Sequence, residues 1–241
     1  MDLHGKIALV TGAAKRLGRA IAIELARSGC DVAIHHGHSP DSAHAVGVEI
    51  SQMGRRTWVF QADLARPEQI ERMMRAVGQH CAHLDVLVNN AGIYERTPIE
   101  TLSADAWDAI MAVNARAPAL CISKAIGLMT SGGAIINITD IAAEKAFGGY
   151  PAYCASKAAL IALTKSAARS LAQKNIRVNS VAPGVAIWQD ETPEDIRRQV
   201  LDQIPMHRPG TPEDIAAAVA FLSSQDYITG QNLRVDGGWL M

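Results

Sequence analysis

The chain lacks the features that would direct it to a membrane, to secretion or to nucleic acid. Its 23 basic and 24 acidic residues leave a net charge of −1, so no excess of charge favours a nucleic-acid surface or a disordered tail. No apolar stretch is long enough to cross a bilayer, and the first residues carry no apolar signal core. These absences predict a soluble, cytoplasmic protein without membrane or nucleic-acid partners.

Cysteine is scarce and scattered. The four cysteines are Cys30, Cys81, Cys121 and Cys154, and none forms a Cys-x-x-Cys pair. This spacing favours separate buried thiols in a reducing compartment over a metal centre. We therefore expect no metal site.

Short apolar, β-rich runs alternate with longer amphipathic segments along all 241 residues. This alternation is typical of βαβ units on a parallel sheet. We expect one α/β domain over residues 1–241, a Rossmann-type, doubly wound, seven-stranded parallel sheet with ligands at the carboxyl ends of its strands. The expected strands are Lys6–Val10, Asp31–His35, Thr57–Gln61, Leu84–Asn89, Ala134–Thr139, Ile176–Val181 and Asn232–Val235. The expected helices are Leu17–Ser28, Pro40–Met53, Pro67–Cys81, Ala104–Ala117, Ala119–Met129, Tyr153–Gln173 and Pro212–Ser223, with Val185–Pro212 irregular.

The first expected strand leads into a glycine-rich turn and then a helix. Glycines in such a turn let backbone N–H groups approach a pyrophosphate, and the helix N-terminus adds positive potential. An arginine between the glycines adds a cation whose fork fits phosphate oxygens. The turn predicts a dinucleotide site, the alternative being an ordinary turn. The residues expected to bind are Gly12, Lys15, Arg16, Leu17 and Gly18.

The end of the second expected strand indicates which dinucleotide binds. A carboxylate there would bind the adenosine 2′-hydroxyl, but residues 35–39 contain none. His35, His36, His38 and Ser39 would instead offer imidazole and hydroxyl groups to a 2′-phosphate. The segment therefore favours NADPH over NADH, the alternative being a polar loop without influence on specificity.

The loops after the third and fourth expected strands offer further cofactor contacts. Asp63 could accept a hydrogen bond from the adenine amino group, with Leu64 beside it. Asn90, Ala91 and Gly92 follow the fourth strand, where small residues let the backbone approach the cofactor closely.

Tyr153 and Lys157 lie four residues apart, so a helix places them on one face. A nearby ammonium favours the phenolate, which lowers the pKa of the phenol and makes it a usable acid or base. Asn114 lies in an apolar helix, where a buried amide must be satisfied, and a structural role is as well supported there as a catalytic one.

Taken together, these motifs resemble the short-chain dehydrogenase/reductase family from Lys6 to Gly238. The resemblance rests on the glycine loop, residues 89–92, 114, 153 and 157, on Pro183-Gly184 and on Asp236-Gly237-Gly238. It implies hydride transfer with a nicotinamide cofactor, NADP(H) here, and a homotetramer. Tyr153 would donate the proton, Lys157 would lower its pKa and bind the nicotinamide ribose, and Asn114 would hold a water of the proton relay. Further cofactor contacts are implied at Thr139, Pro183 and Gly184.

Several residues resemble the pteridine reductase branch of this family. Arg16 in the glycine loop, Asp140 in place of the usual serine, and Tyr94 after Asn-Asn-Ala-Gly follow its pattern. Tyr150, three residues before Tyr153, does so too. The resemblance implies that Arg16 touches cofactor phosphate and pterin, and that the ring of Tyr94 sandwiches the pterin against the nicotinamide.

Three positions depart from that branch. Tyr94 stands where the branch has phenylalanine, Gly92 where it has serine, and His38 where an arginine is often seen. The region Val185–Pro212 resembles the substrate-covering loop of the family, with Trp188 either in contact with substrate or merely exposed.

Asp140 narrows the substrate by its chemistry. Ketone reduction builds an alkoxide, to which the usual serine donates a hydrogen bond. An ionised aspartate cannot donate, and its charge opposes the alkoxide and raises the pKa of Tyr153. A substrate with N–H donors, or one protonated at a ring nitrogen, fits better; the alternative is that Asp140 merely caps a turn.

The sequence therefore predicts NADPH-dependent reduction of a dihydropterin, such as dihydrobiopterin or dihydromonapterin, with dihydrofolate as a further candidate. The expected substrate contacts are Arg16, Tyr94, Asp140, Tyr150 and Tyr153. The alternative enzyme is an NADPH-dependent carbonyl reductase for a 3-oxoacyl, sugar or steroid substrate. A non-catalytic NADP-binding redox sensor is a third possibility, against which the intact Tyr153, Lys157 and Asn114 count.

Overall fold

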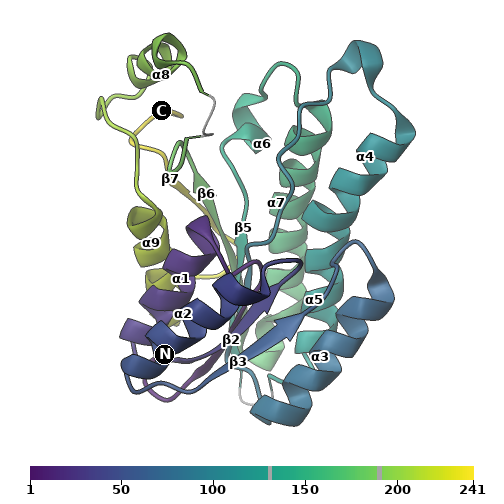
Figure 1. Ribbon diagram of the computed structural model, residues 1–241, viewed down its shortest axis with the longest axis vertical. Helices are drawn as coiled ribbons and strands as arrows, with labels where there is room; N and C mark the ends of the chain where they lie inside the picture. The colour runs from purple at the N-terminus through teal and green to yellow at the C-terminus, as the bar shows by residue number, and fades with distance from the viewer. Residues whose placement is uncertain (130–131, 189–191) are drawn as a thin grey trace.

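Seven parallel strands form one sheet in the order β3-β2-β1-β4-β5-β6-β7, shown by a computed structural model that describes residues 1–129, 132–188 and 192–241 (Figure 1). The strands are β1 (Ile7–Val10), β2 (Asp31–His36), β3 (Thr57–Gln61), β4 (Val86–Asn89), β5 (Gly133–Ile138), β6 (Ile176–Pro183) and β7 (Asn232–Val235). Every residue of β1, β2, β4 and β5 is buried, as expected of strands covered by helices on both faces. The predicted Rossmann-type single domain is confirmed.

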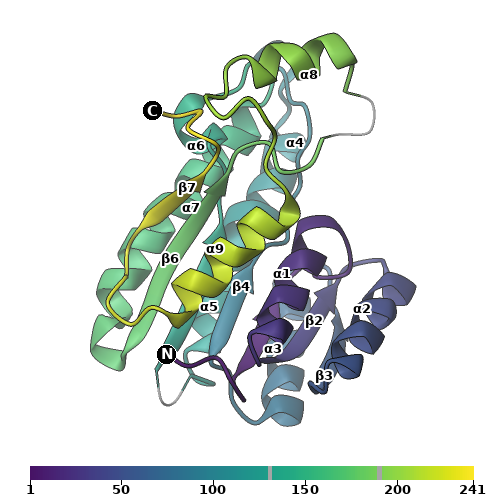
Figure 2. The same cartoon turned by 90° about the vertical axis from the view of Figure 1, so that its left-hand side faces the viewer.

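Helices cover both faces of the sheet (Figures 1 and 2). They are α1 (Arg16–Arg27), α2 (Pro40–Gln52), α3 (Pro67–Cys81), α4 (Ala104–Met111), α5 (Ala117–Ala125), α6 (Ala142–Lys145), α7 (Pro151–Leu171), α8 (Glu194–Leu201) and α9 (Pro212–Ser224). One apolar cluster joins α1, α2 and α9 to one face, and a second joins α3, α5 and α7 to the other. Among the described residues, no helix combines the length and apolar character needed to span a bilayer.

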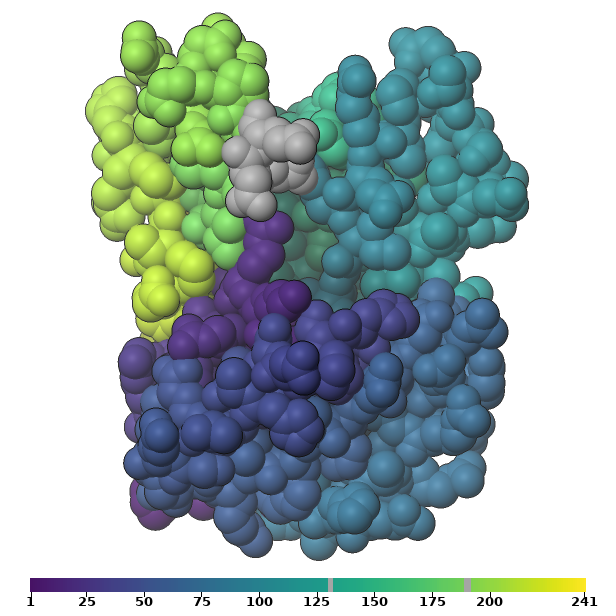
Figure 3. Space-filling model, viewed as in Figure 1, coloured from purple at the N-terminus to yellow at the C-terminus, as the bar shows by residue number. Residues whose placement is uncertain are grey.

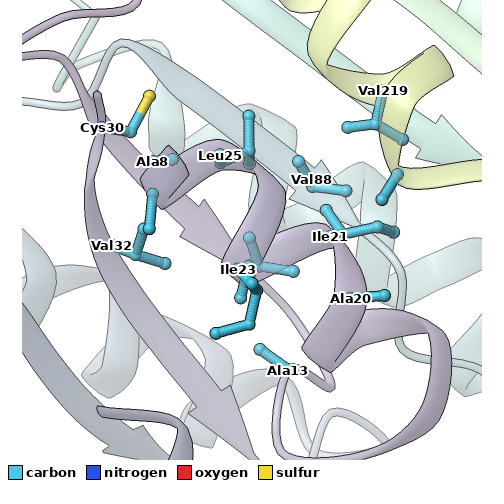
Figure 4. Packing of buried hydrophobic residues seen from close by; sticks show 14 of the residues in the cluster. Ala8, Ala13, Ala20, Ile21, Ile23, Leu25, Cys30, Val32, Val88 and Val219 are labelled. Atoms are coloured by element: carbon cyan, nitrogen blue, oxygen red, sulfur yellow. The ribbon is translucent and has the colours of Figure 1, made fainter. Parts of the chain in front are cut away.

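The first cluster shows how the sheet fixes α1 (Figure 4). Ile21 and Leu25 are fully buried, and they pack with Val32 and Val88 from two strands and with Val219 from α9. Burying side chains of this size contributes roughly 1.5–3 kcal/mol each. The helix N-terminus and the turn before it are therefore held firmly at the carboxyl edge of the sheet.

The strand order reverses beside β1, which pairs with β2 on one side and with β4 on the other. Val10, the last residue of β1, lies opposite Ile34 and Val88. In doubly wound sheets ligands bind at such a reversal, outside the carboxyl ends of the strands. A space-filling view shows the molecule notched between the segment around α8 and the segment around α4 (Figure 3).

The structure corrects three expected boundaries. The segment Val185–Pro212, expected to be irregular, contains α8, which starts directly after Pro193. The helix expected over Ala104–Ala117 is α4 followed by a π-helical segment, η2 (Ala112–Arg116). Helix α7 begins at Pro151, two residues before the expected Tyr153, because proline is well suited to the first helical turn.

Candidate active site

The predicted catalytic pair and Asp140 meet at the carboxyl end of β5. The hydroxyl of Tyr153 donates a hydrogen bond to Oδ2 of Asp140 over 2.7 Å. Nζ of Lys157 donates to the backbone oxygen of Ile138 over 2.9 Å and lies 5.6 Å from the centre of the Tyr153 ring. All three side chains come from β5 and α7, whose packing therefore sets their geometry.

Asn114 is fixed by the π-helical segment η2. Its Oδ1 accepts from the N–H of Ile93 over 2.8 Å, and its Nδ2 donates to the backbone oxygen of Ile93 and to Oγ of Ser156. Ser156 in turn donates to the backbone oxygen of Tyr153 over 2.7 Å. The amide is 1% exposed and satisfied, so it holds the loop after β4 against α7.

Ser156 was missed in the sequence analysis. It lies three residues after Tyr153 on the same helix, a spacing that places both on one face. That signal was available, because a buried hydroxyl on the face of the catalytic tyrosine needs a partner.

Burial dominates the electrostatics of this cluster. It raises the pKa of Asp140, against the hydrogen bonds from Ala142 and Tyr153 and the charge of Lys157. Burial lowers the pKa of Lys157 to about 8, opposed by Asp140. Burial and then Asp140 raise the pKa of Tyr153 well above its usual 10. The expectation that Lys157 lowers the pKa of Tyr153 is therefore wrong for this structure, and Tyr153 keeps its proton, as a proton donor requires.

Two further tyrosines extend the cluster outward. The ring of Tyr94 stacks on that of Tyr150, with centres 4.6 Å apart and planes at 18°. The same ring meets Tyr153 edge-on, at 4.6 Å and 87°. Tyr94 is 40% exposed, so the aromatic group ends at the surface beside the catalytic hydroxyl. The sandwiching of a pterin by Tyr94 stays a prediction.

The glycines of the turn after β1 are required by close packing. Gly12 has φ +65°, and a Cβ added there would lie 3.1 Å from the Cα of Ala91. A Cβ on Gly18 would lie 2.1 Å from the backbone oxygen of Gly12, which no side chain can accommodate. Nδ2 of Asn90 donates to the oxygen of Thr11 over 2.8 Å and joins the two loops. Gly92 completes this edge, with its Cβ position 3.6 Å from Nζ of Lys157.

Arg16 occupies a position of positive φ, +51°, where the family pattern has glycine. Its side chain is exposed, and its Nη2 donates to the backbone oxygen of Trp188 over 3.3 Å. The glycine turn thus touches the segment that resembles a substrate-covering loop. Contacts of Arg16 with phosphate and pterin stay predictions. Lys15, also exposed, and Leu17 flank it.

His35 does not have the predicted role. Its Nδ1 accepts from the N–H of Gly12 and its Nε2 donates to the oxygen of Ala62, each over 3.0 Å. Burial lowers its pKa to about 4, so the ring is neutral. No ring nitrogen is left to donate to a phosphate, and His35 instead fixes the glycine turn. Of the neighbouring histidines, His36 is buried and His38 exposed, with Ser39 preceding α2.

Other predicted cofactor residues have structural partners. Oδ1 of Asp63 accepts from the N–H of Ala65 over 2.9 Å, and the side chain of Leu64 packs in the second apolar cluster. The hydroxyl of Thr139 lies 2.9 Å from both the oxygen of Val181 and Oδ1 of Asn232, so only its backbone is available to a ligand.

The strand end at Pro183 and Gly184 is closely packed. Pro183 ends β6, and a Cβ on Gly184 would lie 2.9 Å from the Cα of Asp236. Glycine is needed there because the backbones of two chain segments approach each other. Contact of either residue with a cofactor stays a prediction.

Comparison with known proteins identifies the family. The family model described as enoyl-(acyl carrier protein) reductase matches residues 12–240. The solved structure of a short-chain dehydrogenase/reductase from Serratia marcescens superposes with a TM-score of 0.93 at 36% identity, covering 99% of both chains. The chain belongs to the short-chain dehydrogenase/reductase family. It is therefore an oxidoreductase of the short-chain type.

The named relatives favour a carbonyl substrate. A 3-oxoacyl-[acyl-carrier-protein] reductase, FabG, of Staphylococcus epidermidis is 41% identical over 98% of this chain and 99% of its own. The structure of the angucycline C-6 ketoreductase LanV with bound NADP is 34% identical, with a TM-score of 0.93 over 99% and 97% of the two chains. A blue fluorescent protein from a metagenomic library, in complex with NADPH, is 37% identical with a TM-score of 0.94 over the whole of both chains. These names agree with the carbonyl-reductase alternative and do not support the pteridine reductase branch.

Proposed function

We propose that the protein is an NADPH-dependent reductase of a ring C=N bond in a dihydropterin-type substrate. The observation that carries the proposal is Asp140, whose carboxylate accepts the hydrogen bond of the Tyr153 hydroxyl over 2.7 Å. Asp140 is also the first polar side chain beyond the end of β5, so it faces whatever reacts beside Tyr153.

The charge of Asp140 separates the two substrate classes. An alkoxide that forms next to a carboxylate is destabilised, whereas a ring nitrogen that takes up a proton is stabilised by it. The second of the Asp140 oxygens accepts the N–H of Ala142 over 2.8 Å, which holds the carboxylate in place. The fixed negative group therefore favours a nitrogen heterocycle with N–H donors.

The residues present fit a nicotinamide dinucleotide. The turn at Gly12 and Gly18 leaves no space for side chains between the backbones of the two loops, as close approach of a pyrophosphate to a turn requires. NADPH is supported over NADH by the absence of a carboxylate in residues 35–39 and by two relatives whose structures contain NADP or NADPH. When bound, the nicotinamide supplies the hydride.

The chain's own residues handle the proton. Tyr153 gives its hydroxyl proton to the ring nitrogen as the adjacent carbon accepts the hydride, and it regains a proton from solvent. Asp140 orients the Tyr153 hydroxyl, and Lys157, anchored on Ile138, supplies a positive charge close to the phenolate that forms. Asn114 keeps the loop after β4 in register with α7.

A second candidate is reduction of a 3-oxoacyl thioester, which the names of the relatives favour. For that reaction Asp140 would have to be protonated, so that it could donate to the developing oxyanion. Burial raises the pKa of Asp140, which extends its protonated form toward neutral pH. This candidate therefore predicts activity that rises as pH falls.

The experiment compares Asp140→Ser with the parent on dihydrobiopterin and on an acetoacetyl thioester, following NADPH oxidation. The pterin assignment predicts a fall of at least about tenfold in kcat/KM for the pterin and a gain for the thioester, since serine donates to an oxyanion. Asp140→Asn is the matched control for shape, and melting curves check folding. An unchanged pterin rate, or a parent enzyme active only on the thioester, would overturn the assignment. A homotetrameric assembly and a cytoplasmic location stay predictions.

A further inference from the structure

The strongest unexplained feature lies at the end of β2. His36 is 4% exposed, and its Nδ1 has no hydrogen-bond partner among the described residues. Its side chain shares a strand face with Val32 and Ile34, which pack in the cluster beneath α1 and α2. A buried polar atom without a partner is costly, so the position calls for a ligand or another reason.

Two more histidines lie around His36. His38 is exposed in the turn that leads to α2, and His44 is exposed on that helix. Burial lowers the pKa of His36, and the charges of His44 and His38 lower it further, which places all three imidazoles close together. Ser39 precedes α2 and makes no capping bond with its side chain, so the N–H groups of the first turn lack that partner.

The surrounding charges leave these histidines in a weakly positive setting. Two carboxylates on adjacent elements are paired, Glu49 with Arg19 and Asp63 with Arg66. The other charged groups on the neighbouring elements are Lys15 and Arg16 of the glycine turn and Asp41 in the first turn of α2. An anion bound here would meet imidazole groups, the helix N-terminus and the two basic residues.

We propose that His36, His38 and His44 form an imidazole receptor for the 2′-phosphate of NADP(H), so that the choice between NADPH and NADH depends on pH. The inference rests on the cofactor assignment of the proposed function but not on its substrate. Unlike an arginine, which is always charged, an imidazole attracts phosphate strongly only when it is protonated.

The direction of the pH effect follows from linkage. A bound phosphate favours imidazolium, so binding of NADPH takes up protons and weakens as pH rises through the histidine range. The phosphate itself loses charge below about pH 6, which limits the gain on the acid side. NADH carries no 2′-phosphate, and its affinity has no such dependence.

The test measures the Kd of NADPH and of NADH by titration calorimetry at about pH 6.5 and about pH 8.5. We expect the NADPH affinity to fall about tenfold between the two, and that of NADH to change less than about twofold. Calorimetry in two buffers of different ionisation enthalpy should show proton uptake with NADPH only. Neither readout requires turnover.

Variants assign the effect to the histidines. His38→Gln with His44→Gln removes the two exposed rings without disturbing the core, and adding His36→Gln should abolish the remaining pH slope. His80→Gln is the matched control, an exposed histidine near the end of α3, at the opposite edge of the sheet. Equal pH slopes for both cofactors, or an unchanged slope in the double variant, would overturn the receptor. Failure to reduce a pterin would refute the substrate assignment and leave these binding results intact.

Discussion

The catalytic cluster and the histidines after β2 lie at the same edge of the sheet, but their polar groups are used differently. Asp140, Tyr153, Lys157 and Asn114 are all engaged in hydrogen bonds and largely buried. His36, in contrast, keeps an unpartnered nitrogen among the described residues, and the histidines near it are exposed. The comparison indicates a preorganised end, where a proton moves, and an adaptable end, where a ligand group is recognised.

The largest expected effect tests the preorganised end. Tyr153→Phe removes the hydroxyl that donates to Asp140, and a positioned general acid is worth ~10²–10⁴-fold. We expect a loss of that size in kcat with the Kd of NADPH almost unchanged, measured by steady-state kinetics and calorimetry. Turnover near that of the parent would remove Tyr153 as the proton donor.

The second prediction concerns His35, the one histidine of its segment that resembles the catalytic cluster in being fully engaged. Its pKa is lowered from 6.5 to about 4, so the unfolded chain binds the proton more readily. Its stabilising contribution is therefore complete above pH 6.5 and is lost as pH falls toward 4, about 3 kcal/mol in all. Melting curves across this range should show the loss.

His35→Asn sharpens that result. The amide can still accept the N–H of Gly12, but it does not titrate, so the acid-dependent part of the loss should shrink. His80→Gln, on an exposed histidine, should leave the acid dependence unchanged. The same acid dependence in His35→Asn as in the parent would contradict the role of His35.

The third prediction tests whether the buried amide is structural. Asn114→Ala leaves the N–H and C=O of Ile93 without partners, which costs about 1–3 kcal/mol. Chemical denaturation should show this loss in the free energy of unfolding. Ser156→Ala removes only one of the contacts of Asn114 and should cost less. An equal or larger cost for Ser156→Ala would mean that Asn114 is not the centre of this network.

The smallest expected effect lies in the glycine turn. Arg16 has φ +51°, which disfavours any residue except glycine by about 1 kcal/mol or more. Arg16→Gly should therefore raise the free energy of unfolding by about 1 kcal/mol while weakening NADPH binding. Lys15→Gly is the control, since Lys15 has φ −146° and gains nothing from glycine. Tighter NADPH binding by Arg16→Gly would refute the phosphate contact.

The sequence predicted the architecture well because the information was local. Each strand is a short apolar run between turn residues, and the pairs Asn89–Asn90 and Pro183–Gly184 fall at strand ends, as expected. Helix α8 was missed because its charged sequence shows little apolar periodicity, although Pro193 marks its start.

The site was predicted less completely because its electrostatics depend on packing. Nothing in the spacing of Tyr153 and Lys157 shows that burial raises one pKa and lowers the other. His35 and His36 are adjacent and identical in type, yet the alternation of a strand sends one into a hydrogen-bonded position and leaves the other unpartnered. The tertiary structure decides between them.

The π-helical segment around Asn114 also makes the chain sensitive to length. A π-turn has one residue more than an α-turn, so the extra residue of η2 shifts the register between α4 and α5. Deleting one residue from Ala112–Arg116 could restore a regular helix, but it would rotate everything on one side by about 100°. Asn114 and α5 could then no longer both face their present partners. Insertions and deletions should therefore be tolerated far less well here than in exposed loops, even where every substitution nearby is mild.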